Sequence, residues 1–204
     1  MSTTTHTRTD SPAETSTKAD LEFHKAAMRL KKVVTRTPLT YNHNLSRKYE
    51  CNVYLKREDL QVVRSYKIRG AYNMMSSLPP EQLQRGVVCA SAGNHAQGFA
   101  YSCKKLNVNG VVFMPIVTPK QKVNQTRMFG EGNIEIVLVG DTFDDSAEAA
   151  KKFTEENNMT MIPPFDHPRI IEGQGTVGLE ILEDLSDIDY VFVPVGGGGL
   201  SSGV

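Results

Sequence analysis

The sequence has no excess of charge of either sign, few cysteines and no long apolar run. Its 204 residues include 23 basic and 23 acidic side chains, so nothing favours a nucleic-acid or membrane partner. No apolar stretch approaches the length of a transmembrane helix. The three cysteines show no CxxC spacing, and we assign no metal ligands. We expect a cytoplasmic protein with a small-molecule partner, an organelle being the alternative compartment.

Residues 1–20 are rich in Ser and Thr and contain almost nothing that could be buried. We therefore predict a disordered tail. A transit peptide would also be rich in Ser, but it would be rich in Arg and poor in acidic residues. In this tail the acidic side chains outnumber Arg8 and Lys18, which favours the cytoplasm over an organelle.

After the tail, short apolar runs alternate with segments of helical periodicity. The predicted strands are 53–55, 86–90, 110–114, 134–139, 159–162 and 190–195. The predicted helices are 21–34, 67–78, 94–106, 119–129, 143–157 and 173–185. Strands alternating with helices of this length predict an α/β fold with a parallel sheet. The charged cluster 56–60 is interpreted as a solvated connection.

The segment Ser65-Tyr66-Lys67-Ile68-Arg69-Gly70-Ala71 places one lysine where a loop is predicted to open into a helix. The positive end of the helix dipole disfavours the ammonium form of Lys67. A neutral amine is what Schiff-base chemistry needs, because only the free base attacks an aldehyde. The alternative is an ordinary solvated lysine at a helix cap.

A second candidate is the turn Ser91-Ala92-Gly93-Asn94-His95 between a predicted strand and a predicted helix. Small residues there leave backbone N–H groups open at a helix N-terminus, which suits an anion such as a carboxylate. Asn94 adds an amide that could contact a phenolic oxygen. The alternative is a tight turn with Asn94 as the N-cap. Without an Asp or Ser partner at a meaningful spacing, His95 is interpreted as a hydrogen-bonded structural residue.

The third candidate is the run of four glycines at 196–199, followed by Leu200 and Ser201. Consecutive glycines let the backbone approach a ligand closely and aim several N–H groups at one phosphate. The run is neither a GxGxxG fingerprint nor a P-loop, and the alternative is a flexible linker. A lysine, a phosphate loop and an amide-rich carboxylate loop together indicate pyridoxal phosphate, which has an aldehyde, a phenolic oxygen and a phosphate.

These motifs resemble those of the fold-type II (tryptophan synthase β-like) pyridoxal phosphate enzymes. Within that group the chain is similar to the biosynthetic threonine dehydratases, or threonine ammonia-lyases, from about residue 21 to residue 204. The stretches that carry the resemblance are Ser65–Ala71, Ser91–Gly98 and Gly196–Leu200. Two further stretches, Pro163–Pro168 and Gly173–Thr176, resemble the dehydratase subgroup.

The resemblance implies two lobes, each an open, mostly parallel sheet flanked by helices. The large lobe would comprise 21–85 and 164–204, and the small lobe 86–163. The sequence stops at Val204, where the family's catalytic domain continues. We therefore expect an N-terminal part of a longer enzyme, with the large lobe incomplete and with homo-oligomers formed by the full-length protein.

The resemblance also implies roles for individual residues. Lys67 would carry the cofactor and act as the base at the substrate Cα, and Asn94 would contact the cofactor ring oxygen. The cofactor phosphate would be held by Gly196, Gly197, Gly198, Gly199 and Leu200. The substrate carboxylate would be bound by Ser91, Ala92, Gly93, Asn94 and His95. The implied reaction is α,β-elimination of L-threonine, and of L-serine, with L-threonine giving 2-oxobutanoate and ammonia in the first step of isoleucine biosynthesis.

Three alternatives stay open at this point: a serine racemase, a catabolic dehydratase of the same fold, and a non-catalytic fragment that only binds the cofactor. A racemase needs a proton donor on both faces of the cofactor, and the racemase loop resembles Ser-Ser-Gly-Asn-His. Here the second position is Ala92, which has no proton to give. Ala92 therefore favours the dehydratase.

Overall fold

The computed structural model describes residues 21–204, and the tail predicted at 1–20 lies outside these described residues. The helices are α1 (Phe23–Leu30), α2 (His43–Tyr49), η1 (Glu58–Leu60), α3 (Lys67–Ser76), α4 (Pro80–Arg85), α5 (Asn94–Leu106), α6 (Lys120–Gly130), α7 (Phe143–Glu156), α8 (Pro168–Asp184) and α9 (Gly199–Gly203). The strands are β1 (Leu39–Tyr41), β2 (Tyr54–Lys56), β3 (Val87–Ala90), β4 (Gly110–Met114), β5 (Ile134–Leu138) and β6 (Thr160–Met161). None of the helices within 21–204 has the length and apolar character needed to cross a membrane.

The central sheet has four parallel strands in the order β5-β4-β3-β6. The chain moves outward from β3 to β4 and β5, and α7 then carries it back to the other side of β3. In register, Val87 of β3 lies opposite Gly110 of β4 and Thr160 of β6. The α/β class and the parallel sheet predicted from the sequence are confirmed.

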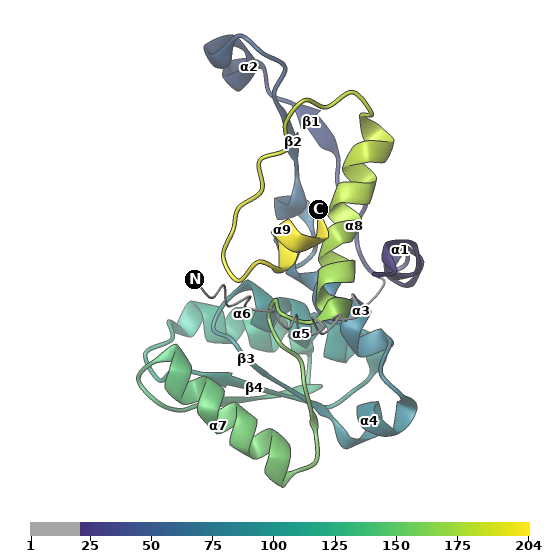
Figure 1. Cartoon of the computed structure of the whole chain (residues 1–204). Helices are drawn as coiled ribbons and strands as arrows, with labels where there is room; N and C mark the ends of the chain where they lie inside the picture. The colour runs from purple at the N-terminus through teal and green to yellow at the C-terminus, as the bar shows by residue number, and fades with distance from the viewer. Residues whose placement is uncertain (1–20) are drawn as a thin grey trace, which may run out of the picture.

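The inner strands β3 and β4 are buried on both faces, and successive side chains of each strand point to opposite faces. Val87 and Cys89 of β3 pack with Phe99 of α5 in one apolar cluster. Val88 of β3 packs with Ala150 of α7 in the other cluster. Figure 1 shows α5 and α6 on one side of the sheet and α7 on the other. Strands covered on both faces are typical of parallel sheets, which explains the continuous apolar run at 87–90.

Helix α3 lies between α5 and α8 and approaches both very closely. A Cβ at Gly98 of α5 would lie 2.9 Å from the backbone N of Ile68. A Cβ at Gly173 of α8 would lie 2.5 Å from the backbone O of Arg69. Only glycine permits this approach of two backbones. The first turn of α3, which carries Lys67, is therefore held against both neighbouring helices.

The charged segment at 56–60 is not merely a solvated connection, and that interpretation was wrong. The Glu58 carboxylate accepts hydrogen bonds at 2.8 Å from the Nε and Nη2 atoms of Arg69, whose side chain is 0% exposed. Glu180 of α8 binds the same guanidinium at 2.7 Å and also pairs with Lys56 at 2.7 Å. Burial raises the pKa of Glu180, but the hydrogen bonds from Arg69 and Lys56 outweigh it and lower this pKa overall. The signal that sequence reasoning missed is the buried arginine two residues after Lys67.

The predicted strand at 190–195 was also wrong. This segment is irregular, and the side chain of Phe192 is 93% exposed. A strand needs a neighbour to complete its backbone hydrogen bonds, and no strand within residues 21–204 pairs with this segment. In the described part of the predicted large lobe, β1 and β2 form an antiparallel pair instead of a parallel sheet.

The other differences concern helix ends and short elements. Helix α8 begins at Pro168, five residues before the predicted start, because His167 Nδ1 accepts the Arg169 N–H at 3.1 Å and caps the helix. Strand β1 and helices α2, η1, α4 and α9 were not predicted. Each has seven residues or fewer, too few to show a clear period.

We predict that Gly98→Val destabilises the protein by roughly 1–3 kcal/mol, because the added side chain must push α5 away from α3. The free energy of unfolding in urea, followed by circular dichroism, measures this effect. Gly93→Ala is the matched control, since a Cβ at Gly93 would meet nothing within 4 Å. Equal stability of the two variants would contradict the close packing of α3 against α5.

Candidate functional site

The sheet topology places two loops side by side at one edge. Strands β4 and β6 lie on opposite sides of β3, so the strand order reverses at β3. In open parallel sheets, ligands bind outside the carboxyl ends of the strands at such a reversal. The loops that leave this edge are Ser91–Gly93 after β3 and Ile162–Phe165 after β6. The second loop continues the pairing of β6 with β3, because the Ile162 N–H donates to Val88 O at 2.8 Å.

Lys67 is the first residue of α3, as its motif predicted. Its amine donates a hydrogen bond to the carbonyl O of Pro164 at 2.7 Å, across 97 residues of sequence. The Tyr66 and Phe165 ring centroids lie 5.5 and 6.0 Å from Nζ. Burial lowers the pKa of Lys67, in the same direction as the expected effect of the helix N-terminus. A lower pKa increases the fraction of free amine, the form that attacks an aldehyde.

The loop at 91–95 leads into α5, which begins at Asn94. The Gly93 N–H donates to Ser91 Oγ at 3.2 Å and tightens the turn. Asn94 is exposed, and the first N–H groups of α5 have no partner within the helix. An exposed amide side chain beside free N–H groups can bind a carboxylate or a phenolate.

His95 is buried, and its Nε2 lies 2.9 Å from the carbonyl O of Ile162. This contact matches the structural role expected for His95 and makes Nε2 the protonated nitrogen of the neutral ring. The pKa of His95 is lowered to about 4, mainly by burial. The charge of Lys67 contributes to this lowering, and the hydrogen bond to Ile162 opposes it. The imidazole is therefore neutral at pH 7.

The glycine loop leads into α9, which begins at Gly199. Gly198 has φ +84°, a left-handed conformation that favours glycine. A Cβ at Gly197 would overlap the ring of Phe165, and a Cβ at Gly199 would lie 2.7 Å from the Phe165 carbonyl O. Gly196 and Gly197 are exposed, so their N–H groups face solvent rather than a packed interior.

One short segment, Ile162–Phe165, brings these parts together. Its Ile162 carbonyl contacts His95, its Pro164 carbonyl contacts Lys67, and its Phe165 ring contacts the glycine loop. From the sequence, this segment carried a family likeness but no predicted part in the site. The available signal was the Pro163-Pro164 pair, which restricts the backbone after a strand.

Two buried polar atoms at this site have no hydrogen-bond partner among residues 21–204. They are Ser65 Oγ, two residues before Lys67, and His95 Nδ1. Unpaired buried polar atoms are rare in native proteins, and a missing ligand is one explanation for them. Within the same residues, no group of three or more His, Cys, Asp or Glu side chains could hold a metal ion.

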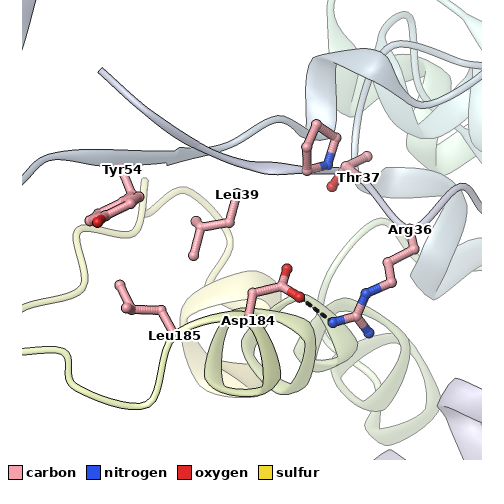
Figure 2. Close-up of a pocket in the computed structure, with 7 residues that line it drawn as sticks. Arg36, Thr37, Leu39, Tyr54, Asp184 and Leu185 are labelled. Carbon is pink, nitrogen blue, oxygen red and sulfur yellow. Dashed lines mark hydrogen bonds and ion pairs between the residues drawn. The ribbon is translucent and has the colours of Figure 1, made fainter. Parts of the chain in front are cut away.

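An open hollow of about 480 Å³ lies elsewhere, at the C-terminal end of α8. Figure 2 shows its wall of Arg36, Leu39, Tyr54 and Leu185, with Arg36 paired to Asp184. It contains none of the predicted site residues. Because the hollow is shallow and its charged groups are already paired, we do not assign the chemistry to it.

Comparison with known proteins identifies related sequences. A family model described as "Pyridoxal-phosphate dependent enzyme" matches residues 30–204. The biosynthetic L-threonine dehydratase of Halalkalibacterium halodurans is 59% identical over 180 residues, covering 88% of this chain and 43% of that protein. The chain thus spans less than half the length of this curated relative.

Solved structures agree with these matches. Threonine deaminase isoform 2 from Solanum lycopersicum, in its processed form, has a TM-score of 0.83 and 44% identity, covering 89% of this chain and 50% of that one. Serine racemase from Dictyostelium discoideum has a TM-score of 0.82 and 35% identity, covering 89% of this chain and 58% of that one. Both support the fold-type II architecture.

We predict that acid destabilises the protein partly through His95. Its pKa is about 6.5 in the unfolded chain and about 4 in the fold. Between these values the unfolded state binds the extra proton, so the free energy of unfolding falls as the pH is lowered. Between pH 7 and pH 4.5 this contribution is roughly 2 kcal/mol.

The measurement compares urea unfolding of the wild type and His95→Gln at both pH values. The glutamine amide can still donate to Ile162 O but does not titrate. Every other titrating group is common to the two proteins. An equal loss of stability in both would show that His95 is not buried in its neutral form.

Proposed function

The chain belongs to the family of pyridoxal-phosphate dependent enzymes, and we propose that it provides the lysine and the substrate loop of a lyase that acts on L-threonine. L-Threonine gives 2-oxobutanoate and ammonia, L-serine is a second substrate, and the reaction is the first step of isoleucine biosynthesis. The observation that supports this most directly is the convergence of Lys67, the loop at 91–95 and the glycine loop on the segment Ile162–Phe165. The 59% identity to a biosynthetic L-threonine dehydratase adds to it.

The residues of the site fit the cofactor. Pyridoxal phosphate has an aldehyde, a phenolic oxygen and a phosphate. Lys67 offers an amine of lowered pKa, Asn94 an exposed amide, and Gly196 and Gly197 backbone N–H groups at exposed positions. Ser65 Oγ, close to Lys67 in sequence, and His95 Nδ1 have no partner among residues 21–204, which leaves them free to bond to a ligand. Each functional group of the cofactor therefore has a chemical counterpart in this chain.

Lys67 is the proposed base. When bound, the cofactor supplies an electron sink for the negative charge that develops at the substrate Cα. The neutral amine of Lys67 accepts the Cα proton in this proposal. The Pro164 carbonyl, 2.7 Å from Nζ, accepts one amine hydrogen and limits where the amine can move. Burial lowers the pKa of Lys67 and so raises the fraction of neutral amine that can accept a proton.

The loops orient the substrate and the cofactor. N–H groups at the start of α5 bind the substrate carboxylate, and Asn94 binds the ring oxygen. The N–H groups of Gly196–Leu200 bind the phosphate. The β-hydroxyl and the proton taken from Cα leave together as water, and an enamine remains. The free enamine tautomerises to an imine, which reacts with water to give 2-oxobutanoate and ammonia.

Serine racemase is the second candidate, because a solved racemase structure also covers 89% of this chain. Racemisation requires a second proton donor, on the cofactor face opposite Lys67. Ala92 occupies the loop position where the racemase-like loop has a serine, and its methyl group cannot donate a proton. Elimination needs only the base on one face, so Ala92 favours the lyase.

The organisation of the whole protein is part of the proposal. We assign 86–163 to a small lobe, because the four-stranded sheet lies within 87–161, and 21–85 with 164–204 to a large lobe. Cytoplasmic location is supported by the unpaired cysteines, of which Cys89 and Cys103 are buried. We also propose a homo-oligomer for the full-length protein, with no nucleic-acid or membrane partner, consistent with the balanced charge.

We predict that Lys67→Ala in the full-length protein abolishes both cofactor attachment and turnover. The readouts are the visible absorbance of a lysine Schiff base after addition of pyridoxal phosphate, and 2-oxobutanoate release from L-threonine. Lys152→Ala, on the exposed face of α7, is the matched control and should leave both unchanged. A Lys67→Ala variant that keeps the band and the turnover would refute the assignment of Lys67.

We predict that the wild type releases 2-oxobutanoate from L-threonine and forms no D-serine from L-serine. Ala92→Ser introduces a hydroxyl at the second loop position and should give measurable D-serine while 2-oxoacid release continues. Chiral chromatography of the products distinguishes the two reactions, and Ala92→Gly, which adds no donor, is the control. D-Serine formation by the wild type would refute the argument from Ala92 and assign the protein to the racemases.

A further inference from the structure

We propose that Phe165 is a positioning residue that fixes the glycine loop, Gly196–Leu200, in the conformation that receives the cofactor phosphate. The inference rests on the proposed function, since it concerns the same ligand. The observation behind it is the packing of one aromatic residue against two glycines of the loop. Neither the family likeness nor the sequence motifs assign Phe165 a role.

The contact between Phe165 and the loop is close on two sides of the residue. Its ring occupies the space where a Cβ of Gly197 would be, and its carbonyl O and Cα lie 2.7 and 3.0 Å from the Cβ position of Gly199. Four consecutive glycines have more conformational freedom than any other sequence of that length. Such a loop holds one conformation only if something outside it provides a surface to pack on.

Phe165 can provide that surface because its own backbone is held on both sides. On one side Pro164 has a fixed φ and accepts the hydrogen bond from Lys67. On the other side the His167 N–H donates to the Phe165 carbonyl at 3.2 Å, and His167 caps α8. The residue is therefore anchored to the N-terminus of a 17-residue helix.

The same residue also relates the loop to the reactive amine. The ring centroid of Phe165 lies 6.0 Å from Lys67 Nζ while the ring packs on Gly197. Pyridoxal phosphate carries its aldehyde and its phosphate on one rigid ring, so amine and loop must be held at a matching separation. Phe165 lies between the two and sets that separation.

This role predicts a selective defect. Without the ring, the loop samples many conformations, and phosphate binding must then restrict them at an entropic cost. Pyridoxal lacks the phosphate and does not use the loop, so its binding is spared. Loss of Phe165 should therefore reduce the preference for pyridoxal phosphate over pyridoxal, rather than weaken both ligands equally.

The experiment measures the dissociation constants of pyridoxal phosphate and pyridoxal by absorbance, in the full-length protein. In Phe165→Ala we expect about tenfold weaker binding of pyridoxal phosphate and less than about twofold change for pyridoxal. Phe165→Leu keeps part of the packing surface and should show a smaller defect. Phe143→Ala, a half-exposed phenylalanine at the start of α7, is the matched control and should match the wild type.

A second variant tests the contact itself. Gly197→Ala adds the methyl group that overlaps the Phe165 ring, so it should displace the loop and weaken pyridoxal phosphate alone. In the Phe165→Ala background the same methyl enters vacated space and should cost little more. This non-additivity is the sign of two residues that act through one contact.

The outcomes separate the inference from the proposed function. A wild type that forms no lysine-dependent band with pyridoxal phosphate would refute the proposed function. A wild type that binds, with Phe165→Ala and Phe165→Leu weakening both ligands equally or neither, would refute the role of Phe165. Additive effects of Gly197→Ala and Phe165→Ala would refute it as well. If Phe165→Ala does not fold by circular dichroism, Phe165→Leu and Gly197→Ala decide.

Discussion

The buried guanidinium of Arg69 is the interaction on which the geometry of the site depends. It joins Glu58 from the segment before α3 to Glu180 of α8, and the Arg69 side chain is 0% exposed while the two carboxylate side chains keep 12% and 14% exposure. A buried charge is stable only when it is paired and fully hydrogen-bonded, and removal of one partner from such a pair costs roughly 3–5 kcal/mol. Because Arg69 lies two residues after Lys67, the cluster fixes the turn of α3 that presents the amine.

The sheet and the helices meet at the site through the segment that follows β6. Strand order alone brings the ends of β3 and β6 together. The carbonyl groups of Ile162 and Pro164 then accept hydrogen bonds from His95 and Lys67. Two prolines stiffen this segment. The proposed site is thus assembled from four places in the sequence.

The parts of the structure that local chemistry determines were predictable from the sequence. Helix α5 begins at Asn94 and ends at Leu106, and β4 spans 110–114, as their patterns indicated. Strand and helix periods, with glycine and proline at the boundaries, suffice for such elements. The segment 190–195 has the same apolar pattern but forms no strand, since pairing depends on a neighbour that a local pattern does not report.

The sequence by itself determined the α/β class, the family, the lysine at the start of α3 and the two small-residue loops, because these depend on composition, period and motif within short stretches. Tertiary structure alone decided that the charged segment at 56–60 contains a partner for Arg69. It also decided that Phe165 packs on the glycines and that the Pro164 carbonyl accepts a hydrogen bond from Lys67. These contacts join residues far apart in the chain, and no local preference encodes which distant surfaces meet.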